Sequence, residues 1–148
     1  MNTLAWLDRL TSIDTTSRNS NLGLIETARD ALKGHGLDPW LNLNAEGTKA
    51  NLFCTLPAQD GATQGGIALS GHTDVVPVDG QNWSSDPFKL TENAGKLYAR
   101  GACDMKGFIA ASLALVPEFM ALPRSKPMHL ALSYDEEISC LGAPFMLA

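Results

Sequence analysis

The spacing of hydrophobic positions changes along the chain between a helical and a strand-like period. Apolar residues recur every three to four positions in two N-terminal segments, and a third, longer segment is apolar on nearly every side. These segments predict helices over residues 1–10, 22–34 and 106–122, the last of them buried. Short apolar runs bounded by Pro, Gly or Asp predict strands over residues 51–56, 66–70, 96–100 and 128–134. The alternation predicts an α/β fold, a mixed sheet with helices on its faces.

Two details of the pattern concern how these elements connect. Residues 57–65, between the first two predicted strands, are typical of a hairpin or a loose turn. Pro117 lies inside the third predicted helix, so we expect that helix to bend or to be shortened. No internal repeat or low-complexity linker interrupts the chain, so we treat residues 1–148 as one unit without an internal domain boundary.

Composition excludes several classes of function. The 148 residues are 45% hydrophobic, enough for one core, and 11 Lys and Arg against 16 Asp and Glu give a net charge of −5. This acidic balance argues against nucleic-acid binding, which needs clustered basic residues. No apolar run is long enough to span a membrane, and the first residues do not resemble a secretory signal. Three widely spaced cysteines indicate a reducing compartment, so we expect a cytoplasmic protein.

Candidate chemistry gathers after three of the predicted strands. His72 and Asp74 follow the second predicted strand, Asp104 follows the third, and Glu136 with Glu137 follows the last. Functional sites of α/β sheets assemble at the carboxyl ends of strands, so these clusters can converge. Imidazole and carboxylate groups are ligands for divalent metals such as zinc. The sequence therefore predicts a metal site at one edge of the sheet.

The first cluster pairs a metal ligand with an orienting group. His72 can bind a metal, and Asp74, two residues on, projects from the same side of an extended segment. The Asp74 carboxylate can then accept the other imidazole N–H, which fixes the tautomer and raises the basicity of the ligand. The alternative interpretation is a surface histidine beside a turn-forming aspartate.

The other two clusters also have ordinary alternatives. Asp104 precedes a helix, where a simple N-cap is common, but Gly101 and Gly107 would let the backbone approach a ligand, and one carboxylate can bridge two metal ions. Adjacent side chains on a strand point to opposite faces. One of Glu136 and Glu137 would therefore bind metal while the other acts as general base, unless both simply face solvent. Three ordinary alternatives would have to coincide, so we favour the metal site.

Several stretches that contain these residues resemble the M20 metallopeptidase and deacylase family. They are residues 70–77 (SGHTDVVP), 97–101 (LYARG), 104–107 (DMKG) and 135–137 (DEE). The resemblance implies a zinc-exopeptidase-like catalytic domain with two Zn²⁺ per complete site, for which Co²⁺ or Mn²⁺ could substitute. It implies that His72 binds one zinc, Asp104 bridges both and Glu137 binds the other, while Asp74 orients His72 and Glu136 is the general base.

The resemblance also implies a reaction, the hydrolysis of a small-molecule N-acyl amino acid, by a protein that is a homodimer at full length. Ser139 departs from the glycine common after the family's acidic motif, which would affect the loop backbone. Each zinc would receive only two ligands from this chain, against the usual three. We therefore expect residues 1–148 to be the N-terminal portion of the catalytic domain, without the lid and dimerisation domain and inactive alone. Other M20 activities, or a non-catalytic truncated module, remain alternatives.

Overall fold

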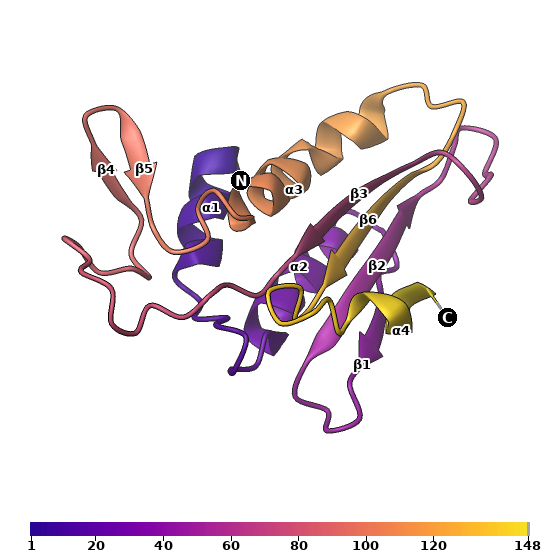
Figure 1. The fold of residues 1–148 in the computed structure, drawn as a ribbon. Coiled ribbons are helices and arrows are strands. Elements are labelled where there is room, and N and C mark those ends of the chain that lie inside the picture. The colour runs from indigo at the N-terminus through magenta and orange to yellow at the C-terminus, as the bar shows by residue number, and fades with distance from the viewer. Residues whose placement is uncertain (148) are drawn as a thin grey trace.

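The structure, a computed structural model, describes residues 1–147 of the chain. Within these residues the helices are α1 (Thr3–Thr11), α2 (Leu22–Gly34), α3 (Lys106–Ala121) and α4 (Ala143–Leu147). The strands are β1 (Trp40–Leu43), β2 (Ala50–Leu56), β3 (Ile67–His72), β4 (Thr91–Asn93), β5 (Lys96–Tyr98) and β6 (Met128–Ser133). Figure 1 shows their arrangement in space. None of the helices in the described part of the chain is long and apolar enough to cross a membrane.

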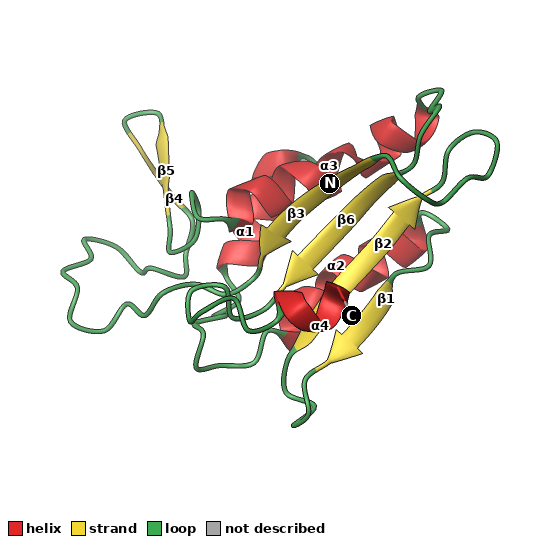
Figure 2. Cartoon of the chain, turned by 45° about the vertical axis from the view of Figure 1, so that its right-hand side comes forward, coloured by secondary structure: helices red, strands yellow, loops and turns green. Residues whose placement is uncertain are grey.

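The main sheet is mixed, as the sequence predicts. Its strand order is β1-β2-β6-β3, with β3 parallel to β6 and the other neighbouring pairs antiparallel (Figure 2). β6, the last strand in the sequence, lies between β2 and β3. The hairpin interpretation of residues 57–65 is therefore wrong, because a hairpin would pair β2 directly with β3. These residues instead connect two strands that are not neighbours.

The core lies between the sheet and three helices. Figures 1 and 2 show α1, α2 and α3 on one face of the sheet, and α4 against the opposite face beside β2. Side chains alternate along β2, so that Leu52, Cys54 and Leu56 point to the helices and are buried. They pack with Leu130 and Leu132 of β6. Burial of this apolar surface is the main driving force that holds the helices on the sheet.

Three features differ from the sequence prediction. Residues 96–100 are not a strand of the main sheet, because β5 pairs only with β4 in a separate two-stranded hairpin. α3 continues past Pro117 to Ala121 and is not shortened, since Val116 and its neighbours keep it packed on the core. α3 is also not buried all round, because Phe108 and Met120 are each 38% exposed.

A buried lysine begins α3. Lys106 is 0% exposed, and its Nζ donates a hydrogen bond to the carbonyl oxygen of Ile13 at 2.7 Å. Burial lowers the pKa of this ammonium to about 8, although the negative charge of Asp14 opposes the change. This hydrogen bond ties the start of α3, two residues after Asp104, to the loop that follows α1.

Candidate metal centre

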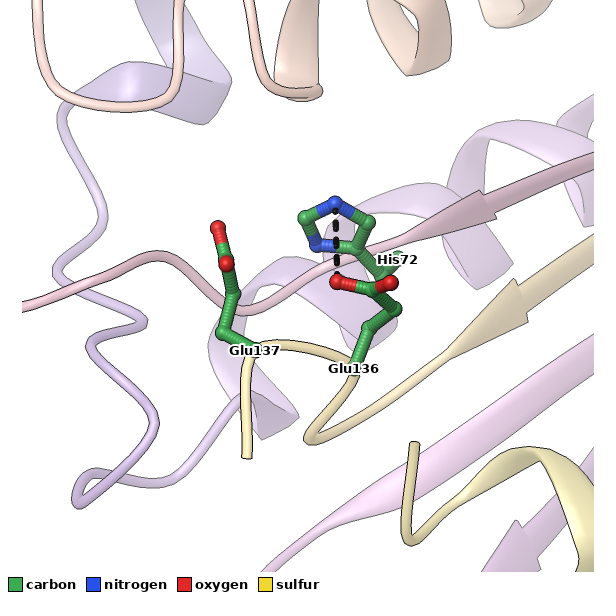
Figure 3. Close-up of side chains that lie close together, drawn as sticks. All are labelled: His72, Glu136 and Glu137. Atoms are coloured by element: carbon green, nitrogen blue, oxygen red, sulfur yellow. Dashed lines mark ion pairs between the residues drawn. The ribbon is translucent and has the colours of Figure 1, made fainter. Parts of the chain in front are cut away.

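Two parallel neighbouring strands bring His72 and the acidic pair together. β3 and β6 run in the same direction, and His72 is paired in register with Ser133. The carboxyl ends of both strands therefore lie at the same edge of the sheet, and Glu136 and Glu137 follow Ser133 within a few residues (Figure 3). This is the convergence that the sequence analysis predicts for the first and third clusters.

His72 is buried and has a defined orientation. Its side chain is 6% exposed, and its Nδ1–H donates to the backbone carbonyl oxygen of Asp74 at 3.0 Å. The other nitrogen, Nε2, faces carboxylates, with Asp104 Oδ1 at 3.0 Å and Glu136 Oε2 at 3.7 Å. Burial opposes the charged imidazolium, but the hydrogen bonds with Asp74 and Asp104 outweigh it and raise the pKa of His72 to about 9. The surroundings of Nε2 therefore favour a positive charge.

Asp74 connects the histidine to the loop that carries the glutamates. Its carboxylate is buried and accepts hydrogen bonds from Ser17 Oγ at 2.7 Å and from the backbone N–H groups of Glu136 at 3.0 Å and Glu137 at 3.2 Å. It also lies 3.5 Å from His72 Nδ1. Burial opposes ionisation, but the hydrogen bonds from His72, Ser17 and the two amides prevail and lower the pKa of Asp74. We predicted that the Asp74 carboxylate would orient the imidazole. In the structure both this carboxylate and the backbone carbonyl oxygen of Asp74 contact Nδ1 of His72.

Glu136 and Glu137 lie in a turn and not on a strand, because β6 ends at Ser133. The prediction that their side chains point to opposite faces is therefore wrong. One ligand atom from each glutamate and one from His72 lie within 4.8 Å of one another. Burial raises the pKa of Glu137, and the nearby carboxylates of Asp104, Asp74 and Glu136 raise it further against the attraction of His72. A bound cation would relieve this repulsion between carboxylates.

Asp104 comes from the turn that precedes α3. Met105, not Asp104, occupies the N-cap position, and no side-chain hydrogen bond caps this end of the helix. The N-cap interpretation of Asp104 is therefore wrong, and its exposed carboxylate instead contacts His72 Nε2. Among residues 1–147, the group of three ligand atoms within 4.8 Å does not include Asp104. The structure thus brings Asp104 to His72, but not into this closer group with the two glutamates.

Gly101 and Gly107, on either side of Asp104, lie where a side chain would collide with other atoms of the protein. Gly101 has a φ of 77°, and a Cβ there would lie 2.6 Å from Cγ1 of Val75. A Cβ on Gly107 would lie 2.4 Å from the carbonyl oxygen of Ala102. These close contacts are with protein atoms, which differs from the predicted approach of the backbone to a ligand. The glycines allow the tight turn that places Asp104 beside His72.

Sequence reasoning missed three residues beside this cluster. Ser17 donates to Asp74, and the Lys49 ammonium contacts both carboxylate oxygens of Asp135, at 2.5 and 2.6 Å. Ser17 and Lys49 lie far from the acidic motifs in sequence, and no local spacing links either side chain to them. Asp135 belongs to the 135–137 stretch that carries the family resemblance, but nothing in the sequence indicated that it pairs with Lys49.

The donor set suits a divalent metal ion. A neutral imidazole with its Nδ1–H donated to a carbonyl offers Nε2 as a ligand, and three carboxylates lie around it. Zinc and similar ions bind such nitrogen and oxygen donors. The positive charge that the carboxylates favour at Nε2 could equally be supplied by a cation in place of the proton. The side chains present therefore fit a divalent cation.

The chain is similar to a known protein family and to proteins of known structure. The model of peptidase family M20/M25/M40 matches residues 68–148. The chain is 39% identical over 135 residues, 90% of its length, to acetylornithine deacetylase of Pasteurella multocida, and it covers 34% of that protein. Its fold resembles human carnosine dipeptidase 1, with a TM-score of 0.80 and 25% identity over 98% of this chain and 34% of the other.

A second solved structure has the same fold. The M20 family metallo-carboxypeptidase of Sulfolobus solfataricus superimposes with a TM-score of 0.79 and 22% identity, over 99% of this chain and 34% of the other. The chain thus spans about a third of the length of these relatives. The family model covers more than half of the chain, including His72, Asp104 and both glutamates. We conclude that the chain belongs to peptidase family M20/M25/M40.

Proposed function

We propose that this chain forms part of a metal-dependent amide hydrolase that removes the acyl group from an N-acyl amino acid. The specific reaction proposed is that of an acetylornithine deacetylase, in which N-acetylornithine and water give ornithine and acetate, a cytoplasmic step of arginine biosynthesis. The observation that carries the proposal is the convergence of a buried imidazole with three carboxylates at one edge of the sheet. The 39% identity to a named acetylornithine deacetylase supports the choice of substrate.

The proposed roles follow the chemistry of each side chain. His72, Asp104 and Glu137 would hold up to two Zn²⁺, with Asp104 as the shared ligand. Bound zinc would polarise the acyl carbonyl and make water a better nucleophile at neutral pH. Asp74 keeps the proton of His72 on Nδ1, so that Nε2 remains a ligand.

Glu136 is proposed as the group that moves the proton. Its carboxylate is 45% exposed, unlike Asp74, so it can reach a substrate and water. It would accept a proton from the attacking water as general base and pass that proton to the departing nitrogen as general acid. Its Oε2 lies 3.7 Å from His72 Nε2, which puts the proton-transfer group next to the proposed metal ligand.

The ligand count supports a further part of the proposal. With Asp104 shared, each zinc would receive two ligands from this chain, whereas catalytic zinc sites normally have three protein ligands and a water. We therefore propose that residues 1–148 form the N-terminal portion of a longer catalytic domain, homodimeric when complete. The chain by itself would then bind zinc weakly and have little activity.

The test compares the chain alone with the product of the longest reading frame that contains it. Zinc content and hydrolysis of N-acetylornithine, N-succinyl-diaminopimelate and other N-acyl amino acids would be measured for both. We expect the longer protein to prefer N-acetylornithine, and its Glu136→Gln variant to keep zinc but lose about 10²- to 10⁴-fold in rate. Glu118→Gln, an exposed change on α3, is the matched control.

Each result has a defined meaning. Preference for another acyl amino acid or a dipeptide would assign a different M20 activity, such as a desuccinylase, an aminoacylase or a carboxypeptidase. Zinc binding without hydrolysis of any of these substrates would contradict the enzyme and favour a non-catalytic module. Full zinc content and ordinary turnover by residues 1–148 alone would contradict the proposed incompleteness of the site.

A further inference from the structure

A buried ion pair lies directly behind the acidic turn. Nζ of Lys49, the residue before β2, contacts Oδ1 and Oδ2 of Asp135 at 2.5 and 2.6 Å. The two side chains are only 13% and 8% exposed. Lys49 and Asp135 are 86 positions apart in the sequence, so this contact joins the start of β2 to the loop that follows β6. A bidentate, mostly buried pair of this kind restricts both partners far more than an exposed one.

The same ammonium group completes a ring of contacts around the turn. Lys49 Nζ also donates to the backbone carbonyl oxygen of Ser17 at 2.5 Å. Ser17 Oγ donates to Asp74 Oδ2, and Asp74 Oδ1 accepts the backbone N–H of Glu136. Since Glu136 is bonded covalently to Asp135, the ring closes through Lys49, Ser17, Asp74 and the turn itself. Lys49 and Ser17 belong to none of the metal-type clusters, and Lys49 is the one that contacts Asp135 of the turn.

Asp135 needs such a partner because its backbone is in an unfavourable conformation. Its φ is 55°, in the left-handed region that residues other than glycine rarely adopt. This conformation turns the chain back after β6 and brings Glu136 within 3.7 Å of His72. Strained backbone of this kind persists only where the surroundings hold it in place. Three short contacts to one ammonium group meet that requirement.

We propose that Lys49 is a positioning residue for the acidic turn of residues 135–137. It holds Asp135 in its left-handed conformation and so keeps the Glu136 and Glu137 carboxylates next to His72. The consequence for metal binding and catalysis rests on the proposed function, whereas the effect on the turn does not. A residue that merely stabilised the fold would protect the whole chain equally and would have no particular influence on this turn.

The experiment compares the Lys49→Met variant with wild-type protein and with Lys33→Met, a matched change of an exposed lysine in the last turn of α2. Hydrogen exchange of the metal-free chain is followed at the amides of Glu136 and Glu137, with α2 as the internal reference. Co²⁺ binding is then measured by absorption titration of the longer reading-frame product, in which the visible band reports the ligand geometry. Lys49→Met should speed exchange in the turn at least tenfold, leave α2 unchanged, and weaken Co²⁺ binding about 10- to 100-fold.

The two readouts separate the inference from the proposed function. Unchanged exchange in the turn of Lys49→Met, or exchange raised equally in the turn and in α2, would overturn the inference. Absence of Co²⁺ binding in the wild-type longer protein would count against the proposed metal centre, while exchange would still decide the role of Lys49. If Lys49→Met does not fold, Lys49→Met with Asp135→Asn removes both charges, and selective loss of protection in the turn is again the expected result.

Discussion

Replacing Asp74 by Asn keeps the shape of the side chain and removes its charge. The wild-type carboxylate accepts hydrogen bonds from Ser17 and from the backbone N–H groups of Glu136 and Glu137. An amide offers one oxygen and one NH₂ group in the same space, so it cannot accept from both backbone N–H groups. The Ser17 hydroxyl can rotate to accept from the NH₂ group, but one partly buried backbone N–H loses its partner in either amide orientation.

The cost can be worked from these contacts. An unpaired buried donor costs about 1–3 kcal/mol, and the remaining hydrogen bonds become weaker because they are no longer made to a charged group. We therefore expect Asp74→Asn to lower the free energy of unfolding by about 2–4 kcal/mol. The midpoint of thermal unfolding should fall by roughly 5–15 °C.

Urea unfolding followed by tryptophan fluorescence measures this change, with Asp38→Asn at an exposed position as the control. The pKa of Asp74 is lowered in the folded protein, so its contribution is present above the unfolded-state pKa of 3.8 and is lost as the pH falls below it. The difference in the free energy of unfolding between wild type and Asp74→Asn should thus have its full size at pH 7 and become smaller below pH 4. A difference under about 0.5 kcal/mol at pH 7, or one that persists at low pH, would refute this reasoning.

Other predictions concern titration, thiol reactivity and the backbone. The pKa of His72, about 9 in the folded metal-free chain against 6.5 unfolded, means that its stabilisation is complete below pH 6.5 and is lost as the pH rises toward 9. In urea titrations the free energy of unfolding of wild type should fall by about 2 kcal/mol between pH 6 and pH 8 relative to that of His72→Gln. The same pH dependence in both proteins would contradict a proton held on His72 Nε2. Cys54 is buried, and burial with the charge of Asp38 raises the pKa of its thiol to about 11, while Cys103 and Cys140 are exposed. An aromatic disulfide reagent at pH 8 should therefore react quickly with two thiols and reach the third only in urea. Ser139 has a φ of 80°, so Ser139→Gly should raise the free energy of unfolding by about 0.5–1 kcal/mol, and a loss of stability in calorimetry would count against strain there.

Local periodicity predicted the longer elements because each carries its own signal. α2, α3, β2, β3 and β6 agree with the predicted segments to within a few residues. β1 and β4 were missed because they have only four and three residues and bury few side chains. Trp40 and Leu43 of β1, for example, are exposed. The position of β6 between β2 and β3 has no local signal, because it depends on hydrogen bonds between strands that are far apart in the chain.

The sequence by itself determined which groups could bind a metal, and that His72 and the acidic pair come after two predicted strands. It also marked Ser139 as a departure at a position that the structure shows to need a left-handed backbone. Only the tertiary structure decided that both glutamates approach His72, that Asp104 is not a helix cap, and that Lys49 pairs with Asp135. The physical reason is that residue type and local spacing set the chemistry and conformation of each segment, whereas the meeting of distant side chains depends on how the packed core aligns the strand ends and the turns beyond them.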